Sequence, residues 1–241
     1  MKRIFLFDVD GTLTKPREPM HPDFEPHFRE FVRDNAVYLA SGSDLLKIQE
    51  QVPQDILDAC RGIFSSSGNQ LDIRGDLVYK NSFDPSEELK KFLESHIEKS
   101  DYKVKTGKHI EHRPGMINFS VVGRNADSKQ RKEYYKWDHK EQERKKIAVL
   151  LMSKFPELDV KIGGEISIDI YPRGLDKSQA VRYIKSNHDD AKIRFFGDRT
   201  DKDGNDYSVV MSLEEGDGYH SVKNCLETKD LLLCYIKGEL F

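Results

Sequence analysis

Two acidic residues separated by one position follow an apolar run near the start of the sequence. Asp8 and Asp10 lie in the stretch Phe-Asp-Val-Asp-Gly-Thr-Leu-Thr, directly after the apolar residues 4–7. A carboxylate held beside Mg²⁺ can attack phosphorus and form an aspartyl-phosphate. A second carboxylate can give a proton to the leaving oxygen and later take one from an incoming hydroxyl. The pattern therefore predicts Asp8 as the nucleophile and Asp10 as the acid and base, while Gly11 permits a tight turn.

A third carboxylate belongs to the same prediction, although it lies far along the chain. Asp198 follows Phe-Phe-Gly at the end of a second apolar run. Ligands of open α/β sheets lie beyond the carboxyl ends of the strands, so we expect the three acids to converge there. Close like charges are costly to bury without a cation, and an oxygen-only site favours Mg²⁺. Asp8, Asp10 and Asp198 are therefore the predicted metal ligands.

Short apolar runs that end in small or polar residues predict the strands that carry these acids. The runs at 3–7, 36–40 and 192–196 are typical of strands buried on both faces of a parallel sheet. The amphipathic stretches at 24–32 and 44–57 favour helices between such strands. This alternation predicts an α/β unit with a parallel sheet.

The middle of the chain has a different pattern. It favours two helices, at residues 86–98 and 128–155, and three strands, at residues 116–121, 160–162 and 166–170. The last two strands alternate in polarity, as strands of an antiparallel sheet with one wet face do. We therefore predict an α+β unit over residues 84–171, inserted into an α/β unit made of residues 1–83 and 172–241.

The net charge, the cysteine count and the length of the first apolar run exclude several classes of protein. The net charge of -3 gives no attraction to nucleic acid or to an anionic membrane, so neither partner is expected. The three scattered cysteines, Cys60, Cys225 and Cys234, favour reduced thiols over a disulfide framework. The apolar run near the N-terminus is too short for a signal peptide or a membrane span. We expect a soluble, cytoplasmic protein.

Three arginines of the inserted unit predict an anion site. Arg113 precedes the first predicted strand of the insert, Arg124 follows it, and Arg131 lies in the first turn of the second helix. A helix N-terminus offers N–H groups and each guanidinium offers a fork of donors. With Asp127 or Ser128 as the N-cap, the arginine side chains would stay free for a ligand. For any one of these arginines taken alone, a solvated surface charge is the better interpretation in a chain with 39 Lys and Arg residues.

Four elements in order along the chain resemble the motifs of the haloacid dehalogenase (HAD) superfamily. They are Asp8-Val9-Asp10-Gly11-Thr12, Ser41 in Leu-Ala-Ser-Gly-Ser-Asp, Lys177 in Leu-Asp-Lys, and Gly197-Asp198 with Gly204-Asn205-Asp206. The resemblance implies a HAD-like Rossmannoid core with an inserted cap. It also implies that Ser41 hydrogen-bonds the phosphate and that Lys177 screens charge between nucleophile and phosphate. Asn205 and Asp206 would support the metal site by contacting the residues that bind the metal directly.

The insert resembles the cap of eukaryotic-type phosphomannomutases, and the resemblance covers nearly the whole chain. The matching stretches are Arg-x-Gly-Met-Ile-Asn from Arg113, Gly123-Arg124, Arg131, residues 162–169 and residues 175–177. In that family the counterparts of the three arginines hold the phosphate distal to the nucleophile. Arg17, Ser167 and Asp169 would also contact the substrate, and Asn118 is a further candidate on the same cap surface.

The resemblance implies an Mg²⁺-dependent phosphomannomutase that interconverts mannose 6-phosphate and mannose 1-phosphate for GDP-mannose biosynthesis. A hexose 1,6-bisphosphate would act as activator by phosphorylating Asp8, and the subunits would form a homodimer through their caps. The sugar monophosphate would turn end for end and take the phosphoryl group on its other hydroxyl. Arginines that grip by charge would hold either phosphate.

Departures from the family pattern keep two alternatives open. Ser41 stands where the mutases tend to have Gly, and residues 67–69 replace a Glu-Asn-Gly, which favours a HAD-family sugar-phosphate phosphatase. Ser212 replaces a carboxylate of the family's second metal loop, so no second metal site is predicted. A non-catalytic phosphosugar-binding protein is the other alternative, but it would have no use for the proton donor Asp10.

Overall fold

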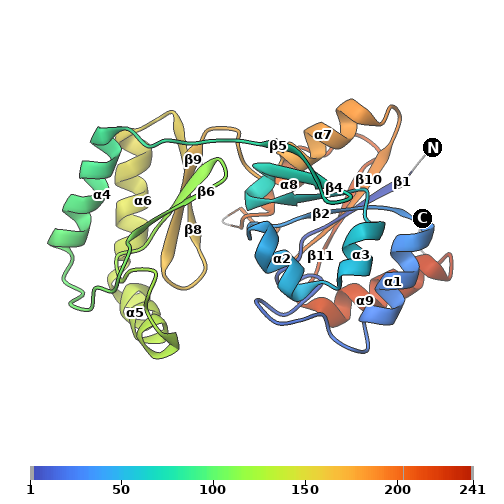
Figure 1. Cartoon of the computed structure of the whole chain (residues 1–241), viewed down its shortest axis with the longest axis horizontal. Helices are drawn as coiled ribbons and strands as arrows, with labels where there is room; N and C mark the ends of the chain where they lie inside the picture. Colours follow the sequence, from blue (N-terminus) through green and yellow to red (C-terminus); the bar gives the residue numbers. More distant parts are fainter. Residues whose placement is uncertain (1–2, 203, 240–241) are drawn as a thin grey trace. The chain divides into compact units, whose positions relative to one another are not determined.

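The computed structural model describes residues 3–202 and 204–239, and the chain folds into two compact units. The core unit comprises Met1–Lys80 and Leu175–Phe241, and the cap unit comprises Asn81–Gly174 (Figure 1). Each unit has its own sheet and its own hydrophobic core. The mixed α/β fold with one mainly parallel and one antiparallel sheet confirms the predicted fold class.

The core unit is built on a sheet in which the described strands have the order β11-β10-β1-β2-β3-β4-β5. From β11 to β3 neighbouring strands are parallel, whereas β4 and β5 are antiparallel additions at one edge. Their bounds are β1 (Arg3–Phe7), β2 (Ala36–Ala40), β3 (Gly62–Ser65), β4 (Gln70–Ile73), β5 (Asp76–Lys80), β10 (Lys192–Gly197) and β11 (Gly218–Ser221). The three predicted strands are confirmed as β1, β2 and β10, and the other four were not predicted.

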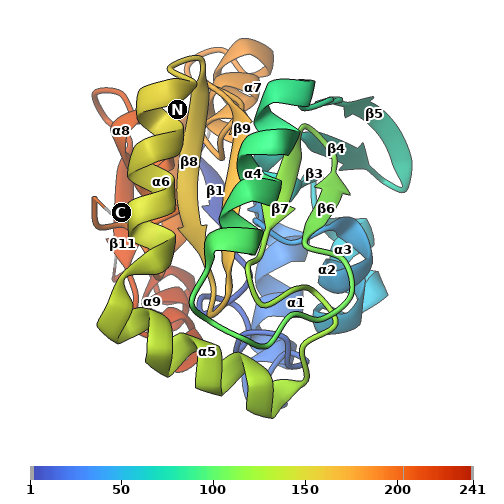
Figure 2. The same ribbon diagram turned by 90° about the vertical axis from the view of Figure 1, so that its left-hand side faces the viewer.

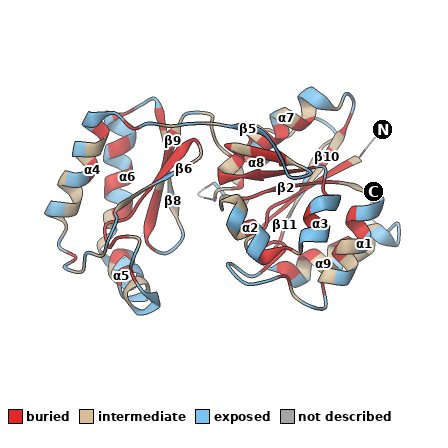
Figure 3. Ribbon diagram, in the orientation of Figure 1, coloured by how far each residue is buried: buried red, intermediate tan, exposed pale blue. Residues whose placement is uncertain are grey.

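Helices cover both faces of the core sheet. Successive residues of β1 point to opposite faces, so Phe5 and Phe7 pack in one apolar cluster while Ile4 and Leu6 pack in another. The first cluster holds α1 (Glu25–Asp34), α2 (Leu45–Gln51), α3 (Gln54–Ala59) and α9 (Cys225–Ile236) against the sheet. The second holds α7 (Gln179–Asn187) and α8 (Tyr207–Met211), with the short 3₁₀ turn η1 (Ser66–Gly68) beside α7. Burial on both faces explains why the central strands are almost wholly apolar (Figure 3).

The amphipathic stretch at 44–57 forms two helices rather than one. The helix α2 ends at Gln51 and α3 begins at Gln54, with Pro53 between them as the N-cap of α3. Proline has no N–H to donate and disfavours helical backbone in the residue before it, so the break falls where Val52 becomes extended. At the other end, the Asp44 side chain caps α2 by accepting from the backbone N–H of Lys47.

The cap unit has an antiparallel sheet with the described strands in the order β6-β7-β9-β8. Their bounds are β6 (Ile110–Arg113), β7 (Met116–Phe119), β8 (Leu158–Gly163) and β9 (Ser167–Pro172). Two helices, α4 (Glu87–Lys99) and α6 (Glu143–Lys154), lie over one face of this sheet, and α5 (Ser128–Glu141) lies across the end of α6 and adds Tyr134 to the same apolar cluster (Figure 2). Side chains of β7 and β9 such as Ile117, Phe119 and Ile168 point toward these helices, which leaves the polar residues of the same strands on the opposite face.

The predicted helix over 128–155 is also two helices. Gln142 adopts left-handed backbone with φ +56° and separates α5 from α6. The buried carboxylate of Asp138 holds this corner, because it accepts hydrogen bonds from the backbone N–H and the Nε–H of Arg144. Asp127 caps α5 in a capping box with Gln130, as one of the two predicted caps. No helix in the described ranges has the length and apolarity needed to cross a membrane.

Candidate active site

The first acid lies at the carboxyl end of β1, in the middle of the core sheet. The backbone N–H of Asp8 donates to the carbonyl of Phe196, so β1 and β10 end side by side. Asp8 is buried, and one of its oxygens accepts a hydrogen bond of 3.2 Å from the hydroxyl of Thr12. Gly11 has φ +84°, and a Cβ built on it would overlap with the carboxylate of Asp198. The turn after β1 therefore requires glycine to let Asp198 approach.

Three carboxylates gather at this point. Oxygens of Asp8, Asp198 and Asp206 lie within 4.8 Å of one another. The ammonium of Lys177, itself buried, donates to Asp8 Oδ1 and to Asp206 Oδ1 at 2.6 Å each. Asp8, Lys177 and Asp198 were all predicted to belong to this site, and Asp206 was predicted to support it.

Burial and like charge oppose ionisation of these acids. Burial raises the pKa of Asp8 well above its usual value, and the charges of Asp206 and Asp198 raise it further against the attraction of Lys177. Burial, together with Asp206, raises the pKa of Asp198 to about 6. Burial lowers the pKa of Lys177, but the charges of Asp206 and Asp8 outweigh burial and raise it overall. Three carboxylates and one ammonium leave a surplus of two negative charges, so the oxygen donors and their charge fit one Mg²⁺.

The carboxylate of Asp10 belongs to a different network. Its Oδ2 accepts from the Ser43 hydroxyl at 2.9 Å, and its Oδ1 accepts from Gln51 Nε2 at 2.9 Å and from the backbone N–H of Arg17 at 3.1 Å. The same amide of Gln51 donates to the hydroxyl of Thr14. Asp206, rather than the Asp10 carboxylate, thus lies with Asp8 and Asp198 in the described structure, and ligation of the metal by Asp10 stays a prediction. Because the Asp10 carboxylate lies apart from the other three carboxylates, it is suited to give a proton to a leaving oxygen and to take one from a hydroxyl.

Sequence reasoning missed Ser43 and Gln51. Ser43 lies two residues after Ser41, in the loop that follows β2, and Gln51 is the last residue of α2. Gln51 lies three residues after Ile48 and so on the apolar face of the predicted helix, and this position was the available signal, since burial of an amide requires partners. Their distance along the chain from Asp10 gave no indication of the contact.

The remaining predicted core residues lie around the same sheet edge. Ser41 follows β2, is fully buried and accepts a hydrogen bond from the backbone N–H of Ser43 at 3.0 Å. Asn205 precedes Asp206, and its buried Oδ1 has no hydrogen-bond partner among the described residues. Arg17 joins the network of Asp10 through its backbone, and its side chain is exposed.

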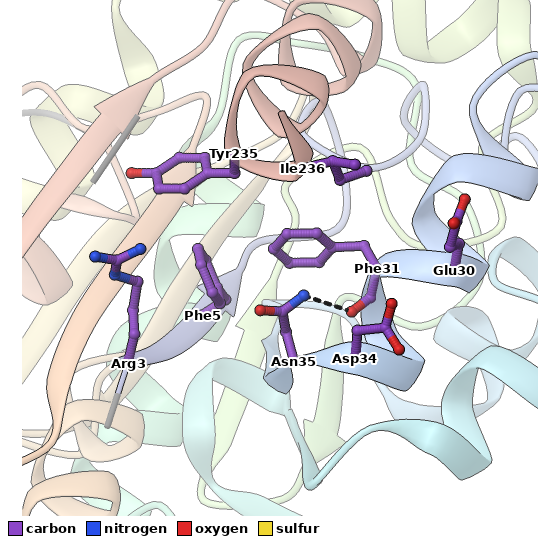
Figure 4. Close-up of a pocket in the computed structure, with 8 residues that line it drawn as sticks. All are labelled: Arg3, Phe5, Glu30, Phe31, Asp34, Asn35, Tyr235 and Ile236. Atoms are coloured by element: carbon purple, nitrogen blue, oxygen red, sulfur yellow. Dashed lines mark hydrogen bonds between the residues drawn. The ribbon is translucent and has the colours of Figure 1, made fainter. Parts of the chain in front are cut away.

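A hollow in the core unit lies at the opposite end of β1 from these acids. It is lined by the amino end of β1 and by the last turns of α1 and α9, including Arg3, Phe31, Asn35 and Tyr235 (Figure 4). The amide of Asn35 donates to the carbonyl of Phe31, which closes the end of α1. None of the predicted site residues lines this hollow, so it has no part in the chemistry predicted for the acids.

Two of the predicted arginines of the cap unit share one partner. Glu111 Oε1 accepts from Arg113 Nε at 2.9 Å, and Glu111 Oε2 accepts from Arg124 Nε at 2.5 Å. Burial raises the pKa of Glu111, but the hydrogen bond and charge of Arg113, with those of Arg124, outweigh it and lower the pKa to about 2. Sequence reasoning also missed Glu111, although its spacing of two from Arg113 on a strand puts both on one face. Arg131 donates from Nε to the carbonyl of Ala126 at 3.1 Å.

The candidate sugar-binding residues of the cap unit extend the same row of the sheet. Glu111 pairs with Asn118 in register, and Asn118 pairs with Asp169. The amide of Asn118 donates to Asp169 Oδ1 at 2.5 Å, while its buried Oδ1 has no partner within the described chain. Burial raises the pKa of Asp169 against the opposing charge of Arg113. Ser167 lies two residues before Asp169 and donates to the carbonyl of Gly163.

A buried arginine supports the hairpin that carries Ser167 and Asp169. Arg144 Nη1 donates to the carbonyl of Gly164 at 3.0 Å and, at 3.4 Å, to the carbonyls of Gly163 and Ser167. The sequence did not single out Arg144, because it lies in a helix dense in Lys, Arg and Glu whose charges were predicted to be solvated. Its burial distinguishes it from them.

Comparisons with solved structures identify the fold. The chain superimposes on a sugar phosphatase of HAD subclass IIB with a TM-score of 0.62 at 16% identity, covering 99% of this chain and 100% of that one. It superimposes on the trehalose-6-phosphate phosphatase of Aspergillus fumigatus with a TM-score of 0.57 at 19% identity, covering 98% and 93%. The chain therefore shares its fold with these two phosphatases.

Comparisons of sequence narrow the assignment. A model of the eukaryotic phosphomannomutase family matches residues 25–233. A phosphomannomutase of Dendrobium officinale is 37% identical over 217 residues, which cover 87% of this chain and 85% of the relative. A phosphomannomutase of Glycine max is 37% identical over 217 residues, covering 87% of both. The chain belongs to the eukaryotic phosphomannomutase family.

Proposed function

We propose that the chain is an Mg²⁺-dependent phosphomannomutase that interconverts mannose 6-phosphate and mannose 1-phosphate. A hexose 1,6-bisphosphate would prime it by phosphorylating Asp8. The observation that carries the proposal is the buried Asp8 at the end of β1, with Asp198, Asp206 and Lys177 around it. Family membership supports the choice of substrate.

Asp8, Asp198 and Asp206 would hold the metal ion, with Asn205 beside them. Bound there, Mg²⁺ would supply positive charge that offsets the charge of the phosphate oxygens. The charge of Lys177 opposes protonation of Asp8, and its hydrogen bond to Oδ1 fixes the orientation of the carboxylate. Thr12 fixes the second oxygen of Asp8. The nucleophile is thereby held in one rotamer before the substrate arrives.

In the first half-reaction an oxygen of Asp8 forms a bond to phosphorus and the bond from phosphorus to the sugar oxygen breaks. Asp10 gives the leaving oxygen its proton. Asp10 Oδ1 already accepts two hydrogen bonds, so the proton is carried on Oδ2. The Ser43 hydroxyl next to Oδ2 can turn from donor to acceptor when the proton is present. In the second half-reaction a sugar hydroxyl loses its proton to Asp10, bonds to phosphorus and displaces Asp8.

The polar face of the cap sheet would hold the other end of the sugar phosphate. Arg113, Arg124 and Arg131 supply guanidinium donors for the distal phosphate. Asn118 Oδ1, which has no partner in the described part of the chain, and the carboxylate of Asp169 supply acceptors for sugar hydroxyls. A mutase must bind the phosphate at position 1 or at position 6 of the hexose in this site, and guanidinium groups can bind both because they recognise the charge of the phosphate.

The cap unit exposes apolar side chains that could form a dimer interface. Apolar side chains of the cap unit are exposed on α5 and α6, with Tyr135, Val149, Leu150 and Met152 each at least 44% exposed. Exposed apolar patches are typical of interfaces, so we propose a homodimer through the cap units, in the cytoplasm.

The decisive assay follows two products at once. Mannose 1-phosphate, Mg²⁺ and a catalytic amount of glucose 1,6-bisphosphate are incubated with the protein, and mannose 6-phosphate and free phosphate are both measured. We expect mannose 6-phosphate to accumulate to equilibrium with little free phosphate. Stoichiometric release of phosphate without added bisphosphate would overturn the mutase and favour the sugar-phosphate phosphatase. The buried hydroxyl of Ser41, as found in many phosphatases of the superfamily, is the feature that favours that rival.

A substitution separates either enzyme from a simple binding protein. We expect Asp8→Asn to abolish turnover while mannose 1-phosphate still binds. Turnover of Asp8→Asn at the wild-type rate would show that Asp8 is not the nucleophile.

A further inference from the structure

One carboxylate of the cap unit organises two of the proposed phosphate ligands. Each oxygen of Glu111 accepts the Nε–H of a different arginine, Arg113 on one side and Arg124 on the other. The side chains of the two arginines are 11% and 14% exposed and that of Glu111 is 32% exposed. Partial burial makes these bonds more ordered than an ion pair on an open surface.

The contact through Nε leaves the outer edge of each guanidinium available. Arginine has five N–H donors in a planar fork, and Nε provides one of them. No side chain or carbonyl among the described residues accepts from the Nη groups of Arg113 or Arg124. Each arginine is thus fixed near the base of its head group and presents its remaining donors as a pair, which is the geometry that phosphate oxygens accept.

The neighbouring residues show that this arrangement belongs to the polar face of the sheet. Glu111 is in register with Asn118, and Asn118 with Asp169, whereas the apolar residues of these strands face the helices. Arg113 lies two residues beyond Glu111 in β6 and therefore on the same face. The carboxylate that fixes the arginines lies in one row with the proposed acceptors for sugar hydroxyls.

We propose that Glu111 is a positioning residue of the phosphate site, which aligns Arg113 and Arg124 for the distal phosphate. The inference rests on the proposed function. Glu111 does not contact the substrate in this account and acts only through the two guanidiniums. A salt bridge that merely stabilises the cap unit would have no selective effect on ligands with a second phosphate.

The test compares Glu111→Gln with a matched control, Glu98→Gln, which replaces an exposed glutamate of α4 in the same unit. The amide introduced by Glu111→Gln keeps one acceptor but sets a donor against the second arginine. We expect the KM for mannose 1-phosphate and the half-saturating concentration of glucose 1,6-bisphosphate to rise about tenfold, as loss of one charged hydrogen bond implies. Hydrolysis of p-nitrophenyl phosphate, which has no second phosphate, should change less than about twofold. Glu98→Gln should leave all three values unchanged.

A double-mutant cycle shows whether Glu111 acts through the arginines. In an Arg124→Ala background the effect of Glu111→Gln on KM should fall to about threefold, and in Arg113→Ala/Arg124→Ala it should vanish. An undiminished tenfold effect in the double background would overturn the proposal. A fall in KM for Glu111→Gln would also overturn it, because Glu111 would then only compete with the ligand for charge. Equal losses with p-nitrophenyl phosphate would indicate a purely structural role.

A spectroscopic readout keeps this inference separate from the proposed function. The Nε–H resonances of Arg113 and Arg124 are followed by NMR while inorganic phosphate is added to the full chain. We expect two slowly exchanging signals in the wild type that respond to phosphate, and their loss in Glu111→Gln. If the wild type converts no mannose phosphate but these signals behave as expected, the proposed function fails and the positioning of the arginines stands. Signals that are already unprotected in the wild type would refute the positioning itself.

Discussion

The buried ammonium of Lys177 allows a quantitative prediction. It bonds to Asp8 and Asp206 at 2.6 Å each and is 1% exposed. Lys177→Met keeps the apolar stem but leaves two buried carboxylates without their partner. Removing one member of a buried ion pair costs about 3–5 kcal/mol, a large part of the total stability of about 5–15 kcal/mol. We expect the metal-free variant to be destabilised by that amount and to lose phosphoryl transfer.

The measurement is urea unfolding in the presence of EDTA, followed by far-UV circular dichroism. With a loss of about 4 kcal/mol and a slope of about 2 kcal/mol per M, the midpoint should fall by about 2 M. The control is Lys223→Met, an exposed lysine of the same unit, for which we expect a change within about 0.5 kcal/mol. Destabilisation below about 1 kcal/mol for Lys177→Met would show that the ammonium does not neutralise buried charge.

Magnesium provides an internal check on the same variant. Without Lys177 the cluster carries a larger negative surplus, so Mg²⁺ should restore more stability to Lys177→Met than it adds to the wild type. Saturation at about 100 times the Kd corresponds to about 2.7 kcal/mol. An Mg²⁺ effect that is equal in the two proteins would mean that Asp8, Asp198 and Asp206 do not form the metal site.

Three further predictions concern single features of the two units. Gly11→Ala should lower stability by about 1–3 kcal/mol and weaken Mg²⁺ binding measured by calorimetry, because its φ of +84° disfavours a side chain and its Cβ would displace Asp198. Unchanged binding would contradict the close approach. The pKa of Glu111 is lowered from 4.5 to about 2. The ionised Glu111 therefore stabilises the cap unit above about pH 4.5, and this contribution disappears as the pH falls toward about 2. The acid unfolding curve of the cap unit, followed by the fluorescence of Trp137, should accordingly be less steep in Glu111→Gln. Arg144→Leu should destabilise the cap unit by about 3–5 kcal/mol and raise the KM for mannose 1-phosphate, and a normal KM in a folded variant would show that the 163–167 hairpin does not depend on it.

The sequence was sufficient to predict the strands that carry the acids because their signal is local. The run before Asp8 is apolar from Ile4 onward, and the run before Asp198 is apolar and buried in its last residues, Phe195 and Phe196, as burial on both faces of a parallel sheet demands. Asp8 and Lys177 were also named from the sequence, and the structure brings them together. The break at Pro53 was visible in the sequence as well, since proline ends helices, but the stretch was predicted as one helix.

The parts that escaped prediction depend on contacts between residues far apart in the chain. Whether Asp10 or Asp206 joins the carboxylate cluster depends on side-chain direction after a turn, which spacing alone does not define. Gln51 reaches Asp10 from another element, across 41 positions. The bend at Gln142 has no Gly or Pro signal, because it is held by the tertiary pair of Asp138 and Arg144. Such features depend on tertiary contacts, which the local sequence pattern does not define.

The cap unit divides the sequence of the core unit into two parts, and this division affects how the core sheet forms during synthesis on the ribosome. The strand β1 pairs with β10, and their partners Arg3 and Lys192 are separated by the whole cap unit. While the ribosome is still synthesising the insert, β1 therefore has one open apolar edge, and such edges associate with other chains. The cap unit, which is continuous in sequence, can fold in the meantime. A chain released before β10 emerges would carry a complete cap unit and a core sheet that ends at β1, without β10 and β11, and would depend on chaperones to stay in solution.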